Sequence, residues 1–138
     1  MASILLIEDD EDIRPLINTM LVRSGHTVRQ AANGLEGVRL YREAPADLVL
    51  TDVVMPEQEG LATILELRRM NPAVKIIAMS GGFAYDPKLY LHMAERFGAD
   101  RVLRKPFQFA ELKQTVDSLL AEPSGGSPAA PAAEPPRA

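Results

Sequence analysis

The chain has 138 residues, of which 46% are hydrophobic and 25% are charged, so it is long enough to form one domain with a substantial core. Its net charge of −4 argues against a nucleic-acid-binding surface, because such surfaces are usually basic. The absence of cysteine excludes a disulfide framework, a thiolate metal site and a cysteine nucleophile.

The N-terminal sequence bears on where the protein acts. The stretch MASILLIEDD lacks the basic start and the long apolar core of a signal peptide. No apolar run approaches the roughly 20 residues that a membrane-spanning helix needs. We therefore expect a cytoplasmic protein without a membrane partner.

Five short, mostly apolar segments bounded by turn residues predict strands at residues 3–8, 27–31, 47–52, 75–80 and 101–105. Apolar residues at helical spacing predict a helix after each strand. In chain order, the apolar positions of these helices are Ile13, Leu16, Ile17, Met20 and Leu21; Val38 and Tyr41; Leu61, Ile64 and Leu65; Tyr90, Met93, Ala94 and Phe97; and Phe109, Leu112, Val116, Leu119 and Leu120. Gly25 and Gly98 follow the first and the fourth helix, where helices commonly end.

The alternation of strands and helices predicts a (βα)₅ domain. The first, third and fourth strands are nearly continuous apolar runs, as expected for parallel strands covered by helices on both faces. Right-handed crossovers then predict an α/β fold with a doubly wound, parallel, five-stranded sheet. Residues 122–138 are almost entirely Pro, Ala, Gly and Ser. We therefore expect one domain over residues 1–121 and a disordered tail over 122–138, with a short docking motif in the tail as the alternative.

Acidic residues stand at the ends of two predicted strands. Glu8 and Asp9 follow the first strand, and Asp52 ends the third. In open parallel sheets the carboxyl ends of the strands meet at one crevice, where like charges would repel. A hard divalent cation, Mg²⁺ or Mn²⁺, would relieve that repulsion. The alternative is that acidic residues after a strand cap the next helix, and we prefer that reading for Asp10 and Asp12.

Two further strand ends complete the crevice. Ser80 ends the fourth strand, and Lys105 ends the fifth, directly before Pro106. A hydroxyl and an ammonium group opposite a metal-bound carboxylate would suit a phosphoryl group, because they supply a hydrogen bond and a positive charge to its oxygens. Neither residue alone carries this interpretation, which depends on all four strand ends converging.

The segments IEDD, TDVVMP, AMSGG and RKPF, at these separations, resemble the response-regulator receiver domain of two-component signalling. The resemblance covers residues 3 to about 121. It implies a flavodoxin-like sheet with the strand order 2-1-3-4-5. It further implies a signalling protein rather than an enzyme, since such a domain promotes its own phosphorylation and dephosphorylation but has no separate substrate.

By this resemblance, Asp52 accepts a phosphoryl group from a histidine kinase or a histidine phosphotransfer protein. Glu8 and Asp9 match the acidic pair that holds Mg²⁺, together with Asp52. Val54 matches the residue whose main-chain carbonyl is a further ligand.

The resemblance also assigns Ser80 to the switch hydroxyl and Lys105 to the lysine of the site. It implies a cis Lys105–Pro106 peptide bond. The output partner would be a protein bound through the face from the fourth strand to the last helix, and no nucleic-acid partner is expected.

Two departures from the family pattern bear on signalling. Val102 stands where many members carry Tyr or Phe, which calls the usual coupling between the hydroxyl and the ring into question. The interval from Ser80 to Lys105 is longer than is usual.

A phosphorelay intermediate fits the sequence as well as a receiver that switches the binding of another protein. The rival functions are a phosphorylation-independent docking module and a phosphohydrolase that forms an aspartyl phosphate. The hydrolase would need a carboxylate at Val54.

Overall fold

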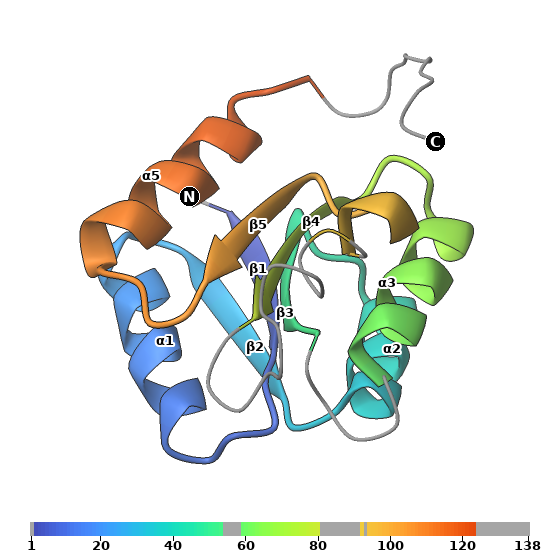
Figure 1. The fold of residues 1–138 in the computed structure, drawn as a ribbon, viewed down its shortest axis with the longest axis horizontal. Coiled ribbons are helices and arrows are strands. Elements are labelled where there is room, and N and C mark those ends of the chain that lie inside the picture. The colour runs from blue at the N-terminus through green and yellow to red at the C-terminus, as the bar shows by residue number, and fades with distance from the viewer. Residues whose placement is uncertain (1, 54–58, 81–91, 93, 124–138) are drawn as a thin grey trace.

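The computed structural model describes residues 2–53, 59–80, 92 and 94–123. The strands are β1 (Ser3–Ile7), β2 (Thr27–Ala31), β3 (Leu48–Asp52), β4 (Lys75–Ser80) and β5 (Arg101–Arg104). The helices are α1 (Ile13–Arg23), α2 (Gly34–Glu43), α3 (Glu59–Met70) and α5 (Phe109–Leu120). The strands form one parallel sheet in the order β2-β1-β3-β4-β5 (Figure 1), which confirms the predicted doubly wound, flavodoxin-like fold.

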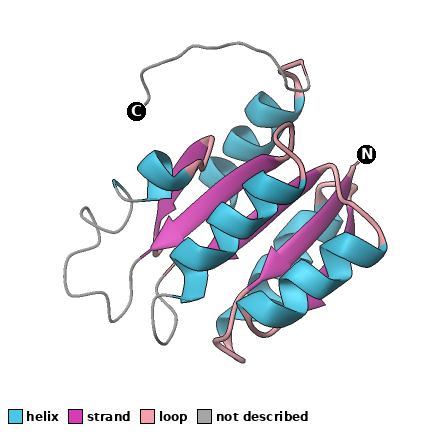
Figure 2. Cartoon of the chain, turned by 90° about the vertical axis from the view of Figure 1, so that its right-hand side faces the viewer, coloured by secondary structure: helices cyan, strands magenta, loops and turns pink. Residues whose placement is uncertain are grey.

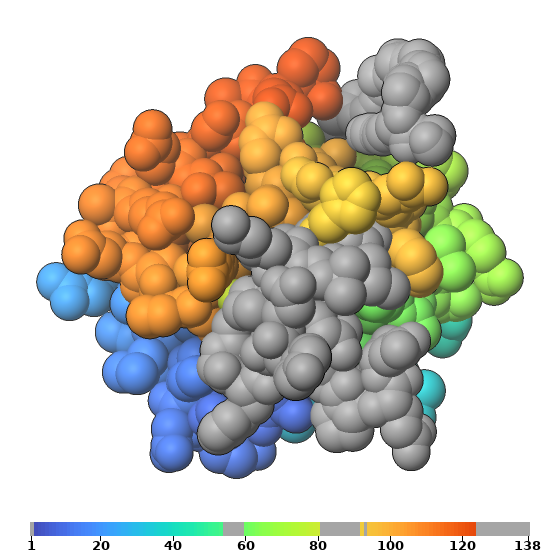
Figure 3. Space-filling model, in the orientation of Figure 1, coloured from blue at the N-terminus to red at the C-terminus, as the bar shows by residue number. Residues whose placement is uncertain are grey.

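Helices cover both faces of the sheet, which explains why the central strands are continuously apolar. Along β1, Ile4 and Leu6 belong to a buried cluster with residues of α1 and α5. Leu5 and Ile7 belong to a second cluster with residues of α2 and α3. Successive side chains of a strand point to opposite faces, so both faces of β1 must be apolar. Figure 2 turns the α2 and α3 side toward the viewer and shows helices in front of the strands, running along them. In the space-filling view α5 lies above α1 (Figure 3).

The prediction that the apolar stripes are buried is wrong at three positions. Leu16 on α1 is 62% exposed, Leu65 on α3 is 50% exposed, and Phe109 at the start of α5 is 39% exposed. α1 buries only Ile17 and Leu21. A helix packed on one side of a sheet turns a narrow stripe toward it, so apolar residues at the edge of the predicted stripe stay in contact with solvent.

The ends of the elements follow the turn residues of the sequence. α1 ends before Gly25, whose φ of 94° lies in the left-handed region that favours glycine, and Gly98 also has a positive φ. The predicted strands are one residue too long at Glu8, Asp47 and Lys105, which directly flank β1, β3 and β5. None of the helices formed by the described residues is long and apolar enough to cross a membrane.

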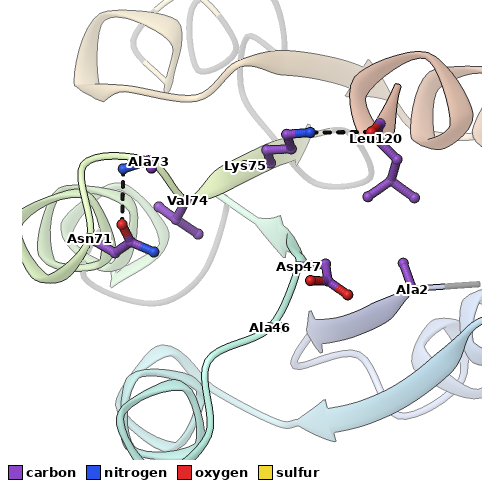
Figure 4. A pocket seen from close by; sticks show the side chains of 8 residues that line it. All are labelled: Ala2, Ala46, Asp47, Asn71, Ala73, Val74, Lys75 and Leu120. Carbon is purple, nitrogen blue, oxygen red and sulfur yellow. Dashed lines mark hydrogen bonds between the residues drawn. The ribbon is translucent and has the colours of Figure 1, made fainter. Parts of the chain in front are cut away.

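The end of α5 is tied to the N-terminal edge of the sheet. The Lys75 ammonium donates a hydrogen bond to the main-chain carbonyl of Leu120, at 3.3 Å (Figure 4), and another to that of Glu122, at 2.5 Å. The Glu122 carboxylate also forms an ion pair with Arg101 of β5. Glu122 therefore has contacts with the sheet although it lies just beyond the predicted domain boundary. The rest of the predicted tail, from residue 124 on, lies outside the described residues.

Candidate functional site

The C-terminal edge of the sheet gathers the polar residues that follow its strands. The main chain there is held by hydrogen bonds that extend the strand ladders. The Glu8 N–H donates to Ala31 O at 3.0 Å, the Val53 N–H to Met79 O at 2.9 Å, and the Lys105 N–H to Ser80 O at 2.7 Å. These bonds hold the main chain at the ends of four strands in place, so the side chains that extend from it lie at one edge of the sheet.

Three carboxylates meet at this edge. One oxygen each from Glu8, Asp9 and Asp52 lies within 4.8 Å of the other two. Glu8 is fully buried, Asp52 is almost fully buried, and Asp9 is exposed. A set of hard oxygen donors with no histidine or cysteine fits Mg²⁺ or Mn²⁺, and one exposed ligand leaves the site open to an ion from solvent.

Lys105 bridges the two buried carboxylates. Its Nζ lies 3.1 Å from Glu8 Oε1 and 3.1 Å from Asp52 Oδ2, and its side chain is only 11% exposed. The second oxygen of Glu8, Oε2, accepts a hydrogen bond from the Asp10 N–H at 3.2 Å. A single ammonium group therefore faces more than one carboxylate, and the described part of the site has an excess of acidic groups.

The pKa values at the site follow from this crowding. Burial raises the pKa of Glu8 to about 7, and the neighbouring Asp52 acts in the same direction, while Lys105 opposes both. Burial and the charge of Asp52 also raise the pKa of Asp9. Burial alone would lower the pKa of Lys105, but the carboxylates of Asp52 and Glu8 outweigh it and raise that pKa. The ammonium group thus stays charged, and the carboxylates gain most from an added cation.

Ser80 ends β4 with a hydroxyl that has no hydrogen-bond partner among the described residues. Its Oγ is buried, and the whole residue is inaccessible to solvent. Leaving a buried hydroxyl unpaired is unfavourable, and such groups commonly mark a place where a ligand completes the hydrogen bonding. The hydroxyl is thus available to donate to an acceptor bound at this edge.

The remaining sequence-based assignments have mixed outcomes. Val54, the expected carbonyl ligand, lies outside the described residues. The Lys105–Pro106 peptide bond is cis, as predicted. Val102 is partly buried and packs against the cluster on the α2 and α3 face. Of the interval after Ser80, residues 81–91 and 93 are outside the described part of the chain.

The predicted helix caps are confirmed for Asp10 and wrong for Asp12. The Asp10 carboxylate accepts hydrogen bonds from the N–H groups of Asp12, at 2.8 Å, and Ile13, at 3.1 Å. Asp12 occupies the N-cap position of α1, but its side chain makes no capping hydrogen bond. The carboxylate two residues earlier already satisfies the first free donors of the helix. These same bonds lower the pKa of Asp10.

Two residues near the site were missed from the sequence. Arg14 donates a hydrogen bond to the main-chain carbonyl of Glu8, at 2.8 Å. Helical side chains point toward the N-terminus of their helix, so a contact between an arginine in the first turn and the preceding acidic loop could have been predicted. Gly60 in α3 packs directly on the main chain of Asp52 and Val53, where a Cβ would collide. Only the folded chain reveals this close approach.

A family model described as the response regulator receiver domain matches residues 4–117. The chain is 36% identical over 119 residues to the DNA-binding transcriptional regulator NtrC of Azospirillum brasilense, and the match covers 86% of this chain and 24% of that protein. It is 31% identical over 117 residues to the chemotaxis protein CheY of Halobacterium salinarum, with coverage of 85% and 95%. The chain thus spans about a quarter of the first protein and nearly all of the second.

The fold is similar to that of a solved structure, the crystal structure of a response regulator receiver domain protein from Clostridium thermocellum. The TM-score is 0.79 at 28% sequence identity, and the match covers 87% of this chain and 94% of that chain. Sequence and structure comparisons therefore agree on the same kind of domain.

Proposed function

The chain belongs to the response regulator receiver domain family of two-component systems, and on that premise we propose that Asp52 accepts a phosphoryl group. The donor is the phosphohistidine of a histidine kinase or of a histidine phosphotransfer protein. The observation that carries the proposal is the nearly buried Asp52 carboxylate, held 3.1 Å from Lys105 beside two further carboxylates. A fixed nucleophile with a cation at its side is suited to in-line attack on phosphorus.

In the transfer step, a carboxylate oxygen of Asp52 forms a bond to phosphorus. The bond from phosphorus to the donor imidazole nitrogen breaks, and that nitrogen keeps the electron pair. The ammonium of Lys105 neutralises one phosphoryl oxygen of the product, and the buried hydroxyl of Ser80 donates a hydrogen bond to another. The protein supplies position and charge rather than covalent chemistry of its own beyond the nucleophile.

The carboxylates of Glu8, Asp9 and Asp52, with the main-chain carbonyl of Val54, are the groups we propose to hold Mg²⁺ or Mn²⁺. When bound there, the cation would neutralise charge that develops on the phosphoryl oxygens. The fit rests on the donor set, on the mutual distance of the carboxylates and on their raised pKa values at Glu8 and Asp9. Without a cation, a dianionic phosphoryl group would lie next to carboxylates whose charge Lys105 offsets only in part.

Receiver domains are signalling modules that interact with histidine kinases and with downstream effectors. For this chain we propose that phosphorylation changes the binding of another protein through the face from β4 to α5. The chain promotes its own phosphorylation and dephosphorylation and acts on no separate substrate. Val102 has no aromatic ring, so the usual coupling between the switch hydroxyl and a ring at this position would be absent. We propose that residues 1–121 form the receiver domain and that residues 122–138 form a tail.

Phosphorylation by acetyl phosphate in the presence of Mg²⁺ tests this function. Intact-mass measurement of the wild-type chain should show one phosphoryl adduct, and Asp52→Asn should show none. Asp47→Asn serves as the matched control, because Asp47 flanks the other end of the same strand and should leave the adduct unchanged. An adduct of equal yield in Asp52→Asn would overturn the assignment of Asp52.

A further inference from the structure

Arg14 spans the acidic turn between β1 and α1. Its Nη1 donates to the main-chain carbonyl of Glu8 at 2.8 Å, and its Nη2 donates to Glu11 Oε1 at 2.6 Å. Its side chain is only 15% exposed, which is low for an arginine at the surface end of a helix. The main-chain N–H of Arg14 also donates to Asp10 O at 3.0 Å. One residue therefore contacts the turn at three places.

The placement of this arginine is unfavourable for the helix by itself. The N-terminal turn of a helix carries a partial positive charge, so a cation in that turn is repelled. The guanidinium lies there among five consecutive acidic residues, 8–12, and its two partners come from the two sides of Asp9. Because Arg14 is unfavourable for the helix but forms hydrogen bonds with the turn, we infer that its role is to stabilise the turn.

The bond to the Glu8 carbonyl has a direct consequence for Asp9. That carbonyl belongs to the peptide unit that joins Glu8 to Asp9, so the bond fixes the orientation of the unit from which Asp9 extends. Asp9 is the exposed member of the carboxylate set, and it has less packing to hold it than Glu8 or Asp52. Its position depends on the main chain of the turn more than theirs do.

We propose that Arg14 is a positioning residue for the cation site, which holds Asp9 in place through the carbonyl of Glu8. This inference rests on the proposed Mg²⁺ site and adds a residue outside the set that touches the ion. Two effects of Arg14 oppose each other. Its charge repels a cation, whereas its hydrogen bonds order the turn before the ion arrives. The contact with Glu11 offsets part of that charge, and the proposal requires that the ordering effect dominate.

The test is a Mg²⁺ titration of the full chain that is monitored by amide NMR, with no phosphodonor present. Arg14→Lys keeps the charge but loses the planar fork that reaches both partners, and Arg14→Met loses both. Both variants should bind Mg²⁺ roughly ten-fold more weakly than wild type, the lower end of the effect seen when a group that orients a metal ligand is removed. Arg39→Met is the control, because Arg39 pairs only with Glu36 and Glu43 on α2 among the described residues.

A second readout separates positioning from a general loss of structure. In the absence of Mg²⁺, the order parameter of the Asp9 amide should fall in both variants, toward values typical of flexible segments, while the amides of β3 keep theirs. If Arg14→Met fails to fold, Arg14→Lys alone decides. Tighter Mg²⁺ binding by Arg14→Met with no change in Arg14→Lys would show that Arg14 acts only by charge and would overturn the proposal.

The outcome also distinguishes this inference from the proposed function. A wild-type chain that binds no Mg²⁺ would remove the cation site itself. A wild-type chain that binds Mg²⁺, with both Arg14 variants equal to it, would remove only the role of Arg14.

Discussion

Replacing Glu8 with glutamine should remove a pH-dependent loss of stability in the metal-free protein. Glu8 is fully buried, and its pKa in the folded chain is about 7, above its ordinary value of 4.5. Below pH 4.5 the carboxyl is protonated in the folded and the unfolded chain, so it has no effect on the pH dependence. As the pH rises from 4.5 through 7, the unfolded chain gives up this proton first, and stability is lost until the folded chain also ionises and buries the charge.

The size of the loss follows from the gap of about 2.5 between the two pKa values. At about 1.4 kcal/mol for each pH unit, the wild-type chain should lose about 3 kcal/mol of folding free energy between pH 4.5 and pH 8 through this group. Other groups titrate in the same range. Burial lowers the pKa of His26, for example, which favours the folded chain at higher pH. The comparison of wild type with Glu8→Gln cancels those contributions to first order.

The assay is urea unfolding in EDTA at a series of pH values from about 4.5 to 8, with the free energy extrapolated to water. The advantage of Glu8→Gln over wild type should grow by about 3 kcal/mol across this range. Glu43→Gln, whose side chain is 59% exposed, should run parallel to wild type. A difference between Glu8→Gln and wild type that stays flat or shrinks with rising pH would refute the reasoning.

Three other predictions concern the metal, the switch and the tail. Asp9→Ala should weaken Mg²⁺ binding strongly in a calorimetric titration and should raise the melting temperature in EDTA, because it relieves repulsion with Asp52; unchanged affinity would contradict it. Lys105→Ala should still be phosphorylated, but the amide NMR shifts around Ser80 and Val102 on phosphorylation should shrink, and full wild-type shifts would count against this. A chain that ends at Glu122 should match the full chain in melting temperature, since it keeps the contacts with Lys75 and Arg101, whereas a clear drop would show that later residues pack on the domain.

Much of the fold could be predicted from local pattern alone. The runs that end at Glu8 and Asp52 have the pattern of buried strands, and ligands bind at the carboxyl ends of parallel strands, so the sequence by itself predicts that their carboxylates meet. The same rule predicted Lys105 in this crevice, but its direct 3.1 Å contact with Glu8, across 97 residues of sequence, was not predicted. The exposure of Leu16 was missed because helical periodicity gives the direction of the buried stripe better than its width.

The role of the turn between β1 and α1 was the least accessible from sequence. The sequence alone does not distinguish the environments of the five consecutive acidic residues. In the structure, however, Glu8 is buried, Asp9 is exposed and Asp10 caps the helix. What separates them is the path of the main chain, which hydrogen bonds such as that from Arg14 define. The sequence pattern predicts that an acidic cluster is present, but the role of each residue in it depends on tertiary contacts.

The most direct test of the central claim is to locate the phosphoryl group in the chain. After reaction with acetyl phosphate and Mg²⁺, borohydride reduces an aspartyl phosphate to homoserine, and peptide mass spectrometry then identifies the altered position. We predict homoserine at position 52 and at no other aspartate, with the peptide that contains Glu8, Asp9 and Asp10 unmodified. Homoserine at Asp9 or Asp10, or no conversion at Asp52 under conditions that give an intact-mass adduct, would contradict the account.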